Sequence, residues 1–210
     1  MTPADDILRD AQPAAEVYRE RTVVSRSQRL ARSGTVGTTV WITGLPAAGK
    51  STLAGALEQL LLHHDLPAYR LDGDNLRLGL NADLGFSHSD RSENVRRTAH
   101  AARLLADAGV IAIVALVSPY ASDRALARRV HVDDGLGFLE VWMSTSLAEC
   151  ERRDPKELYA RARRGELHGM TGIDDPYEPP AAPEITIAHS DAVADAAARV
   201  WQLLRTVVHR

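Results

Sequence analysis

The feature that most constrains this chain is a loop that fits the phosphate-binding pattern G-x-x-x-x-G-K-[ST]. The loop consists of Gly44, Leu45, Pro46, Ala47, Ala48, Gly49, Lys50, Ser51 and Thr52. A β-branched and aromatic run, residues 39–43, precedes it, and leucines and alanines recur at helical spacing after it. Glycine turns and a helix N-terminus present backbone N–H groups to phosphate oxygens, so we predict that residues 44–52 bind a nucleotide.

Two side chains of the loop have expected roles of their own. Lys50 is expected to reach the β- and γ-phosphates of the nucleotide, and Ser51 is expected to be a ligand of Mg²⁺. An ordinary glycine turn before a helix is the alternative, and the flanking strand and helix argue against it. The loop alone does not indicate which group accepts the phosphoryl.

Length, charge and cysteine content set further limits. The 210 residues fit one α/β domain that buries a sizeable core without disulfides, and the net charge of −3 gives no overall attraction to nucleic acid or an anionic membrane. The single cysteine, Cys150, suits a reducing cytoplasm. The longest apolar run, residues 110–117, is too short to span a bilayer. We therefore expect a cytoplasmic protein with neither nucleic acid nor a membrane as partner.

The chain divides by composition into an arm and a domain. Residues 1–37 mix proline, alanine and charge, and we expect a leader that packs on the domain or on a partner subunit, with a short helix over 14–21. Residues 38–210 are expected to form one nucleotide-binding domain.

An acidic turn follows the second predicted strand, residues 67–71. Carboxylates at the C-terminal end of a parallel strand face the ligand-binding crevice. One of Asp72 and Asp74 is therefore expected to hold a water of Mg²⁺ or to accept a hydroxyl proton, while the other is solvated or caps a helix. A plain Asp-Gly turn is the alternative.

A long helix is predicted to begin at an N-cap, Ser89 or Asp90, and to end near residue 107. Arg91 and Asn94 are three residues apart, so they share one face of its first turn, where they can bind an anion. Phe86, just upstream, can stack on a flat ring. A salt-bridged surface helix with a core phenylalanine is the alternative.

The remaining elements complete the predicted fold. Strands are predicted over 110–117, 138–143 and 184–188, and helices over 123–130 and 192–207. Ser118 follows the central strand, but the sequence places no histidine beside it, which disfavours a hydrolase triad. The predicted fold class is α/β, a doubly wound parallel sheet with helices on both faces and a site along the strand C-termini.

A basic segment follows the strand predicted over 138–143. Its charges are Arg152, Arg153, Lys156, Arg161, Arg163 and Arg164, and it ends at Gly165 before the turn-rich residues 169–183. A basic, glycine-bounded segment after a strand is typical of a lid that closes over phosphates, so we predict a mobile lid over about residues 152–175. An exposed basic helix is the alternative.

Over roughly residues 36–205 the chain resembles the adenylyl-sulfate kinase family of P-loop nucleotide kinases. Beyond the phosphate loop, the resemblance is carried by Leu-Asp-Gly-Asp-Asn-Leu-Arg (71–77), Gly-Leu-Asn-Ala-Asp-Leu-Gly-Phe-Ser (79–87), Asp-Arg-Ser-Glu-Asn-Val-Arg-Arg (90–97), Ser-Pro-Tyr (118–120), Arg-Asp-Pro-Lys-Glu-Leu-Tyr (153–159) and Thr-Gly-Ile-Asp-Asp-Pro-Tyr-Glu (171–178). It implies a kinase domain over residues 38–210 that uses ATP and Mg²⁺ to phosphorylate the 3′-hydroxyl of adenylyl sulfate in sulfate activation. It also implies a homodimer, and it makes a sulfate adenylyltransferase a candidate partner.

The resemblance assigns residues to the two substrates. It implies that Arg153 lies close to the ATP adenine, that Lys156 lies near the transferred phosphoryl, and that Arg77, Arg91 and Asn94 hold the phosphosulfate. The acceptor set that it implies is Asp74, Arg77, Phe86, Arg91, Asn94, Arg97 and Met170, with Phe86 and Met170 on the two sides of the acceptor adenine. Asp72 is our choice for general base or metal-water ligand.

The family assigns the serine of its Ser-Pro-Tyr or Ser-Pro-Phe motif, here Ser118, as a phosphoserine intermediate. Direct in-line transfer requires only positioning of the reactants and stabilisation of charge. We therefore expect Ser118 to have no covalent role.

The sequence departs from the family pattern at three places. These are Pro46-Ala47-Ala48 in place of small Ser and Gly residues, Ala121 in place of a common arginine, and His168-Gly169-Met170 in place of a stretch that usually holds Lys, Asn and Phe. Pro46 removes one N–H donor from the phosphate loop. The other two changes touch acceptor recognition, so a kinase for a different adenine nucleotide is one alternative. A non-catalytic nucleotide-sensing subunit is another, and the intact Lys50, Ser51, Asp72 and Lys156 argue against it.

Overall fold

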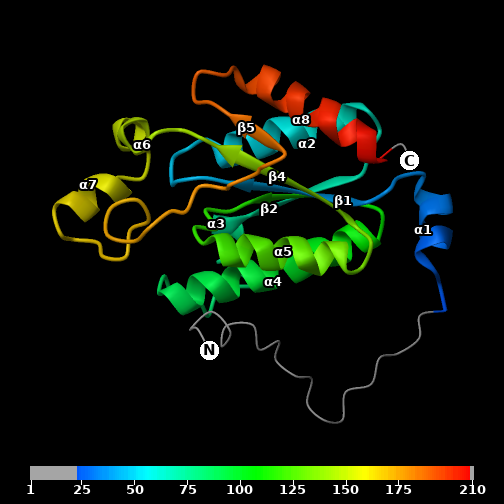
Figure 1. Ribbon diagram of the computed structural model, residues 1–210, viewed down its shortest axis with the longest axis horizontal. Helices are drawn as coiled ribbons and strands as arrows, with labels where there is room; N and C mark the ends of the chain where they lie inside the picture. The colour runs from blue at the N-terminus through cyan, green and yellow to red at the C-terminus, as the bar shows by residue number, and fades with distance from the viewer. Residues whose placement is uncertain (1–22, 209–210) are drawn as a thin grey trace, which may run out of the picture.

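The computed structural model describes residues 23–208. This part of the chain contains a single five-stranded sheet flanked by helices (Figure 1). The strands are β1 (Thr38–Thr43), β2 (Ala68–Asp72), β3 (Ile111–Ala115), β4 (Gly137–Met143) and β5 (Ile185–Ile187), in the order β2-β3-β1-β4-β5. Every neighbouring pair is parallel. The predicted doubly wound parallel sheet is therefore confirmed.

Helices cover both faces of the sheet. Figure 1 shows α2 (Lys50–His63) and α8 (Val193–Val208) on one face, and α4 (His88–Asp107) and α5 (Ala121–Val132) on the other. Successive side chains of β1 alternate between the two cores: Val40 and Ile42 pack in the core that includes α2 and α8, and Trp41 in the core that includes α4 and α5. Both faces of the sheet are covered, so every residue of β1 and β3 is buried, and β3 is apolar throughout its length.

The topology brings the carboxyl ends of the strands to one edge. At this edge β1 leads into the phosphate loop, β2 into the short helix α3 (Gly73–Leu76), and β4 toward α6 (Leu147–Arg153) and α7 (Leu158–Arg163). Figure 1 shows α6 and α7 at the end of the molecule opposite to α1 (Arg26–Ser33). Ligands of open parallel sheets bind at this carboxyl edge, which positions the site described below.

The long helix α4 begins earlier than either predicted N-cap. Its N-cap is Ser87, whose hydroxyl accepts from the Asp90 N–H at 3.2 Å, while the Asp90 carboxylate accepts from the Ser87 N–H at 3.4 Å. This reciprocal capping box satisfies two orphan N–H donors, whereas a cap at Ser89 or Asp90 would leave them unpaired.

The part of the predicted arm that the structure describes contains the helix α1. Ser25 and Gln28 form a capping box at its start, and Arg26 and Arg29 form ion pairs with Asp107 at the end of α4, at 2.8 and 3.1 Å. The helix predicted over residues 14–21 lies outside the described residues. Within residues 23–208, no helix has both the length and the apolar character needed to cross a bilayer.

Candidate active site

A cavity of about 630 Å³ opens at the carboxyl edge of the sheet. Its volume lies within the range usual for small-molecule sites. Of the residues predicted from the sequence, it brings together Pro46, Ala47, Gly49, Lys50, Ser51, Thr52, Asp72, Asp74, Arg77, Phe86, Arg91, Asn94, Ser118, Lys156 and Met170. The phosphate loop, the acidic turn, the first turns of α4, the end of β3 and the lid therefore share one cavity.

The phosphate loop has the backbone that its glycines predict. Gly49 is the N-cap of α2 at φ 101°, and a Cβ at Gly44 would lie 2.9 Å from the side chain of Met143. Ala47, in contrast, adopts φ 61°, a left-handed conformation that costs an L-residue with a Cβ roughly 1–2 kcal/mol. The loop thus keeps its shape in spite of the departure at Ala47.

Lys50 is buried and turned into the loop. Its Nζ donates to the carbonyl oxygens of Gly44 at 2.9 Å and Leu45 at 2.7 Å. Burial lowers the pKa of this ammonium to about 8, against the opposing attraction of nearby acidic groups that include Asp72 and Asp74. Lys50 therefore has a cationic head poised inside the loop that wraps the phosphates.

Asp72 and Asp74 divide their roles across the acidic turn. Asp72 is buried, and its Oδ1 accepts from the Asp74 N–H at 3.1 Å, so the residue that faces the crevice is also the cap of α3. Asp74 is exposed and forms an ion pair with Lys156 of the lid. Of the two carboxylates, Asp72 is thus the one held in a fixed geometry.

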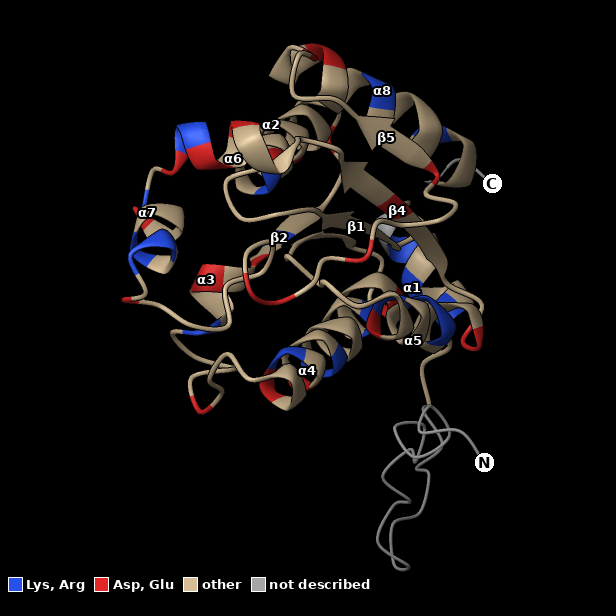
Figure 2. Cartoon of the chain, turned by 60° about the vertical axis from the view of Figure 1, so that its left-hand side comes forward, with Lys and Arg blue, Asp and Glu red and all other residues tan. Residues whose placement is uncertain are grey.

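The Lys156–Asp74 ion pair joins the lid to α3. The chain has only two lysines, Lys50 and Lys156, and both line the cavity. In Figure 2 the basic residues of α7 and the acidic residues of α3 lie on the same side of the molecule. The lid also contacts the phosphate loop, because the buried Tyr159 donates its hydroxyl to Pro46 O at 3.0 Å.

An exposed aromatic ring lies among basic groups on the other side of the cavity. Phe86 is 61% exposed, so the core-phenylalanine alternative is wrong. The Arg77 guanidinium lies 4.2 Å and that of Arg91 5.7 Å from its ring centroid. Burial and the nearby Arg91 lower the pKa of Arg77. Phe86 thus presents a flat ring beside two cations.

Arg91 and Asn94 lie in the first turns of α4, as predicted. Arg91 donates to Gly169 O at 2.6 Å, and its Nε lies 3.5 Å from the Asp175 carboxylate. Asn94 is buried, and its Oδ1 accepts from Asn81 Nδ2 at 2.7 Å. Both side chains are therefore fixed by neighbours that a solvated surface helix would not supply.

Ser118 is buried at the end of β3 with both hydrogen-bonding functions of its hydroxyl engaged. Its Oγ donates to Thr43 Oγ1 at 3.0 Å and accepts from Trp41 Nε1 at 3.1 Å. Its backbone adopts φ 40°. Such an arrangement stabilises the strand ends and offers no adjacent base that would activate the hydroxyl as a nucleophile.

Several predicted site residues do not line this cavity. Gly44, Leu45 and Ala48 of the phosphate loop are absent from its lining, as are Arg97 and Arg153. Arg97 forms ion pairs with Asp83 and Glu93, and Arg153 pairs with Glu149 at 2.8 Å. The sequence interpretation also missed Tyr159, for which the motif at residues 153–159 was the only signal.

Several known proteins are similar to this chain. The model of the adenylylsulphate kinase family matches residues 36–188. The bifunctional enzyme CysN/CysC of Mycobacterium tuberculosis is 48% identical over 203 residues, which cover 95% of this chain and 32% of that protein. The adenylyl-sulfate kinase of Saccharomyces cerevisiae is 54% identical over 149 residues, which cover 71% of this chain and 74% of that protein.

A solved structure is similar over most of the domain. The Mycobacterium tuberculosis APS kinase CysC in complex with AMPPNP and APS has a TM-score of 0.79 and 53% identity, and the match covers 80% of this chain and 98% of that chain. The chain described here spans about a third of the length of the bifunctional Mycobacterium protein that it matches.

Proposed function

The chain belongs to the adenylylsulphate kinase family, and we propose from this premise that it transfers the γ-phosphoryl of ATP to the 3′-hydroxyl of adenylyl sulfate. The products would be 3′-phosphoadenylyl sulfate and ADP. The observation that supports this proposal most strongly is that one cavity holds both Lys50 of the phosphate loop and the Phe86 and Arg91 pair. A phosphoryl donor and an adenine-bearing anion can therefore meet there.

In the proposed reaction the acceptor 3′-oxygen attacks the γ-phosphorus in line, and the bond to the β–γ bridging oxygen breaks as ADP leaves. Asp72 is our candidate to accept the hydroxyl proton, because it is buried at the crevice and held by the Asp74 N–H. Lys50, and Lys156 when the lid is closed, would stabilise the charge on the transferring group. The lid would exclude water from the cavity.

Mg²⁺ is the proposed cofactor. Ser51 and Asp72 both line the cavity and carry the hard oxygen donors that this ion prefers; Ser51 would be a direct ligand, and holding a water of the ion is the alternative to the role of Asp72 as general base. No group of three or more His, Cys, Asp or Glu side chains among residues 23–208 is arranged to hold a metal by itself. Mg²⁺ is commonly bound through one or two protein ligands and the substrate phosphates. When bound, it would neutralise charge on the β- and γ-phosphates.

For the acceptor, we propose that Arg77, Arg91 and Asn94 contact the phosphosulfate and that Phe86 stacks on the adenine. Met170 lines the same cavity, is only 5% exposed, and takes the place of the aromatic residue usual in the family. The guanidinium of Arg97 is paired with Asp83 and Glu93, so we propose that Arg97 supports the neighbouring residues of α4 and does not contact the acceptor directly. Arg153 remains our proposal for the residue beside the ATP adenine.

The remaining proposals concern the molecule as a whole. We propose a cytoplasmic homodimer, with a mobile lid over about residues 152–175, the arm over 1–37 and the kinase domain over 38–210. A sulfate adenylyltransferase is the partner suggested by the fused Mycobacterium relative. Light scattering that gives the mass of a monomer at micromolar concentration would contradict the dimer.

The test of the proposed function is an acceptor screen with coupled detection of ADP release. Adenylyl sulfate is expected to be the preferred acceptor among adenine nucleotides, and Met170→Phe is expected to tighten it by no more than about tenfold. The reason is that a thioether against a ring contributes about 0.3–1.5 kcal/mol, which nearly matches a stacked aromatic pair. Met170→Leu, which keeps the volume without the sulfur, is the control.

The acceptor assignment fails under one pattern of results. In that pattern the protein barely uses adenylyl sulfate, phosphorylates another adenine nucleotide efficiently, and reverses this order when Met170 is replaced by Phe. A kinase for that other nucleotide would then replace the proposal. Absence of any ADP release with every acceptor would instead favour a nucleotide-sensing subunit.

Ser118→Ala is expected to retain substantial activity, since direct transfer requires no phosphoserine. The main expected effect is on stability. The Trp41 N–H would lose its acceptor, so the free energy of unfolding is expected to fall by about 1–3 kcal/mol. Acid quenching after incubation with γ-labelled ATP is expected to yield no phosphoprotein. Stoichiometric labelling that disappears in the alanine variant would show that Ser118 is a covalent intermediate.

A further inference from the structure

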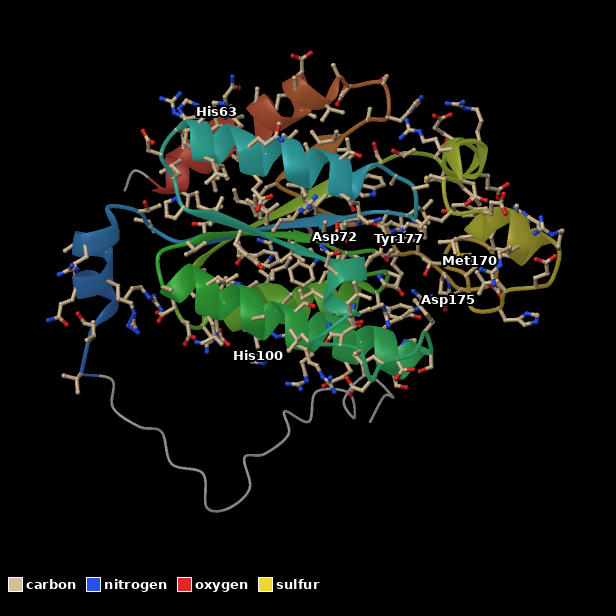
Figure 3. The ribbon with its side chains drawn as sticks, turned by 180° about the vertical axis from the view of Figure 1, so that it is seen from behind. His63, Asp72, His100, Met170, Asp175 and Tyr177 are labelled. Atoms are coloured by element: carbon tan, nitrogen blue, oxygen red, sulfur yellow. The ribbon has the colours of Figure 1, made fainter. Side chains whose placement is uncertain are left out.

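Residues 171–178, here called the strap, begin in the last part of the lid, which reaches to about residue 175, and continue back toward the sheet. The strap is bonded to the loop that follows β3 at two points. The Glu178 N–H donates to Pro119 O at 2.9 Å, and the Tyr120 hydroxyl lies 3.1 Å from both oxygens of the Asp175 carboxylate. In Figure 3 Asp175 and Met170 lie toward the same end of the molecule, and Tyr177 lies between them and Asp72, which is nearer the centre. Thr171, the first residue of the strap, lines the cavity, so the strap adjoins the site and is here called its wall.

Arg124 of α5 joins this wall to two strands. Its side chain is 4% exposed, and three of its nitrogens have separate acceptors. Nη2 donates to Glu178 O of the strap at 2.6 Å, Nη1 donates to Ser118 O at the end of β3 at 2.7 Å, and Nε donates to Glu140 of β4 at 2.9 Å. Because the guanidinium is a rigid planar fork, it fixes these three acceptors relative to one another.

The strap in turn contacts the residues proposed to bind the acceptor. Its Asp175 lies 3.5 Å from Arg91 Nε, and its Gly172 N–H donates to Asp175 O at 2.7 Å. The Asp174 carboxylate accepts from the backbone N–H of Met170, which lines the cavity. A continuous chain of contacts thus links Arg124, through the strap, to Arg91 and Met170.

We propose that Arg124 is a positioning residue for the acceptor site, which it sets by holding the strap against the strand ends. Arg124 does not line the cavity, so it can influence the site only through the segments that it joins. The inference rests on the proposed function, because it takes adenylyl sulfate as the ligand on the Arg91 side. According to this inference, a residue of α5, which covers the same face of the sheet as α4, affects the affinity for the acceptor but not the affinity for ATP.

The test compares Arg124→Lys with Arg128→Lys in the full chain. A lysine at 124 keeps a positive charge near Glu140, which avoids an unpaired buried carboxylate, but its single nitrogen cannot reach all three acceptors. Arg128 lies one turn along the same helix and pairs with Glu184 at 2.7 Å and with Glu140 at 3.6 Å. It shares the Glu140 contact of Arg124 but donates to no residue of the strap, so it is the control for the strap contact. Calorimetry would give the dissociation constants for adenylyl sulfate and for AMPPNP.

Arg124→Lys is expected to raise the dissociation constant for adenylyl sulfate about tenfold and to leave that for AMPPNP within about twofold. Arg128→Lys is expected to change neither. Tyr120→Phe, which removes the bond to Asp175 without disturbing Glu140, is expected to show the same selective loss and decides the matter if Arg124→Lys does not fold.

Equal weakening of both ligands, or unchanged binding of adenylyl sulfate in a folded Arg124→Lys variant, would overturn the inference. If that variant does not fold, unchanged binding in Tyr120→Phe would overturn it. Failure of the unmodified protein to bind adenylyl sulfate at all would overturn the proposed function and this inference with it. The first kind of failure leaves the proposed function intact, so the two are distinguishable.

Discussion

Lys50→Ala is expected to lower kcat by about a hundredfold or more while the protein remains folded. The ammonium lies inside the phosphate loop, where it donates to the carbonyl oxygens of Gly44 and Leu45. An interaction with the transferring phosphoryl strengthens as charge develops, so its loss lowers kcat more than it weakens nucleotide binding. Steady-state ADP release with adenylyl sulfate measures the effect, and circular dichroism checks the fold.

Arg199→Ala is the control for Lys50→Ala. Arg199 pairs with Asp191 at 2.8 Å and does not line the cavity, so its removal deletes a cation elsewhere and is expected to leave kcat unchanged. Near-normal turnover of Lys50→Ala would show that residues 44–52 do not bind the transferred phosphoryl group as proposed.

The lowered pKa of Lys50 predicts a second difference between the unmodified protein and Lys50→Ala, in the protons taken up when the nucleotide binds. Burial holds this pKa at about 8 in the free protein, and bound phosphates favour the protonated form, which raises the pKa. Nucleotide binding above pH 8 is therefore expected to take up a proton, and the affinity is expected to fall as the pH rises further. Calorimetry in buffers of different ionisation enthalpy detects the uptake, which Lys50→Ala is expected to abolish.

Local sequence patterns predicted the elements that carry the site. The strand before Gly44, the glycine at the start of α2 and the carboxylate at the end of β2 each follow from the residues on either side. The position of Ser87 as the cap of α4 was missed, although the capping box with Asp90 is itself a local signal. Patterns over a few neighbouring residues were therefore sufficient for the five strands and for α2, α4, α5 and α8, but they did not predict α1, α3 or α6.

Contacts between distant segments could not be predicted in this way. Glu178 accepts from the Ala121 N–H at 2.6 Å, so α5 begins at Ala121 because a carboxylate 57 residues away caps it, two residues before the predicted start. Arg97 shares a motif with Arg91, but Asp83 binds it through two oxygens and draws it away from the cavity. No periodicity encodes such pairings, since they depend on which strand ends become neighbours in the sheet.

Arg91→Ala is expected to weaken binding of adenylyl sulfate by roughly 2–4 kcal/mol, a loss of about thirtyfold to a thousandfold, while ATP binding stays close to normal. The guanidinium lies 5.7 Å from the centroid of the Phe86 ring, on the side of the cavity that we propose for the acceptor, so its charge is expected to act on the acceptor anion more than on ATP. Arg91 also donates to Gly169 O at 2.6 Å, so part of the loss would come from the lid end that it holds. Calorimetry with each ligand separately measures both affinities.

Arg96→Ala is the matched control, because Arg96 lies on the same helix, pairs with Glu93 at 2.7 Å and does not line the cavity. Arg91→Lys separates charge from geometry: an ammonium retains the attraction for the anion but not the planar fork, so it is expected to recover only part of the loss. If Arg91→Ala weakened ATP and adenylyl sulfate equally, Arg91 would belong to a wall shared by both substrates. The division of the cavity into a phosphate-loop side and an acceptor side would then be wrong.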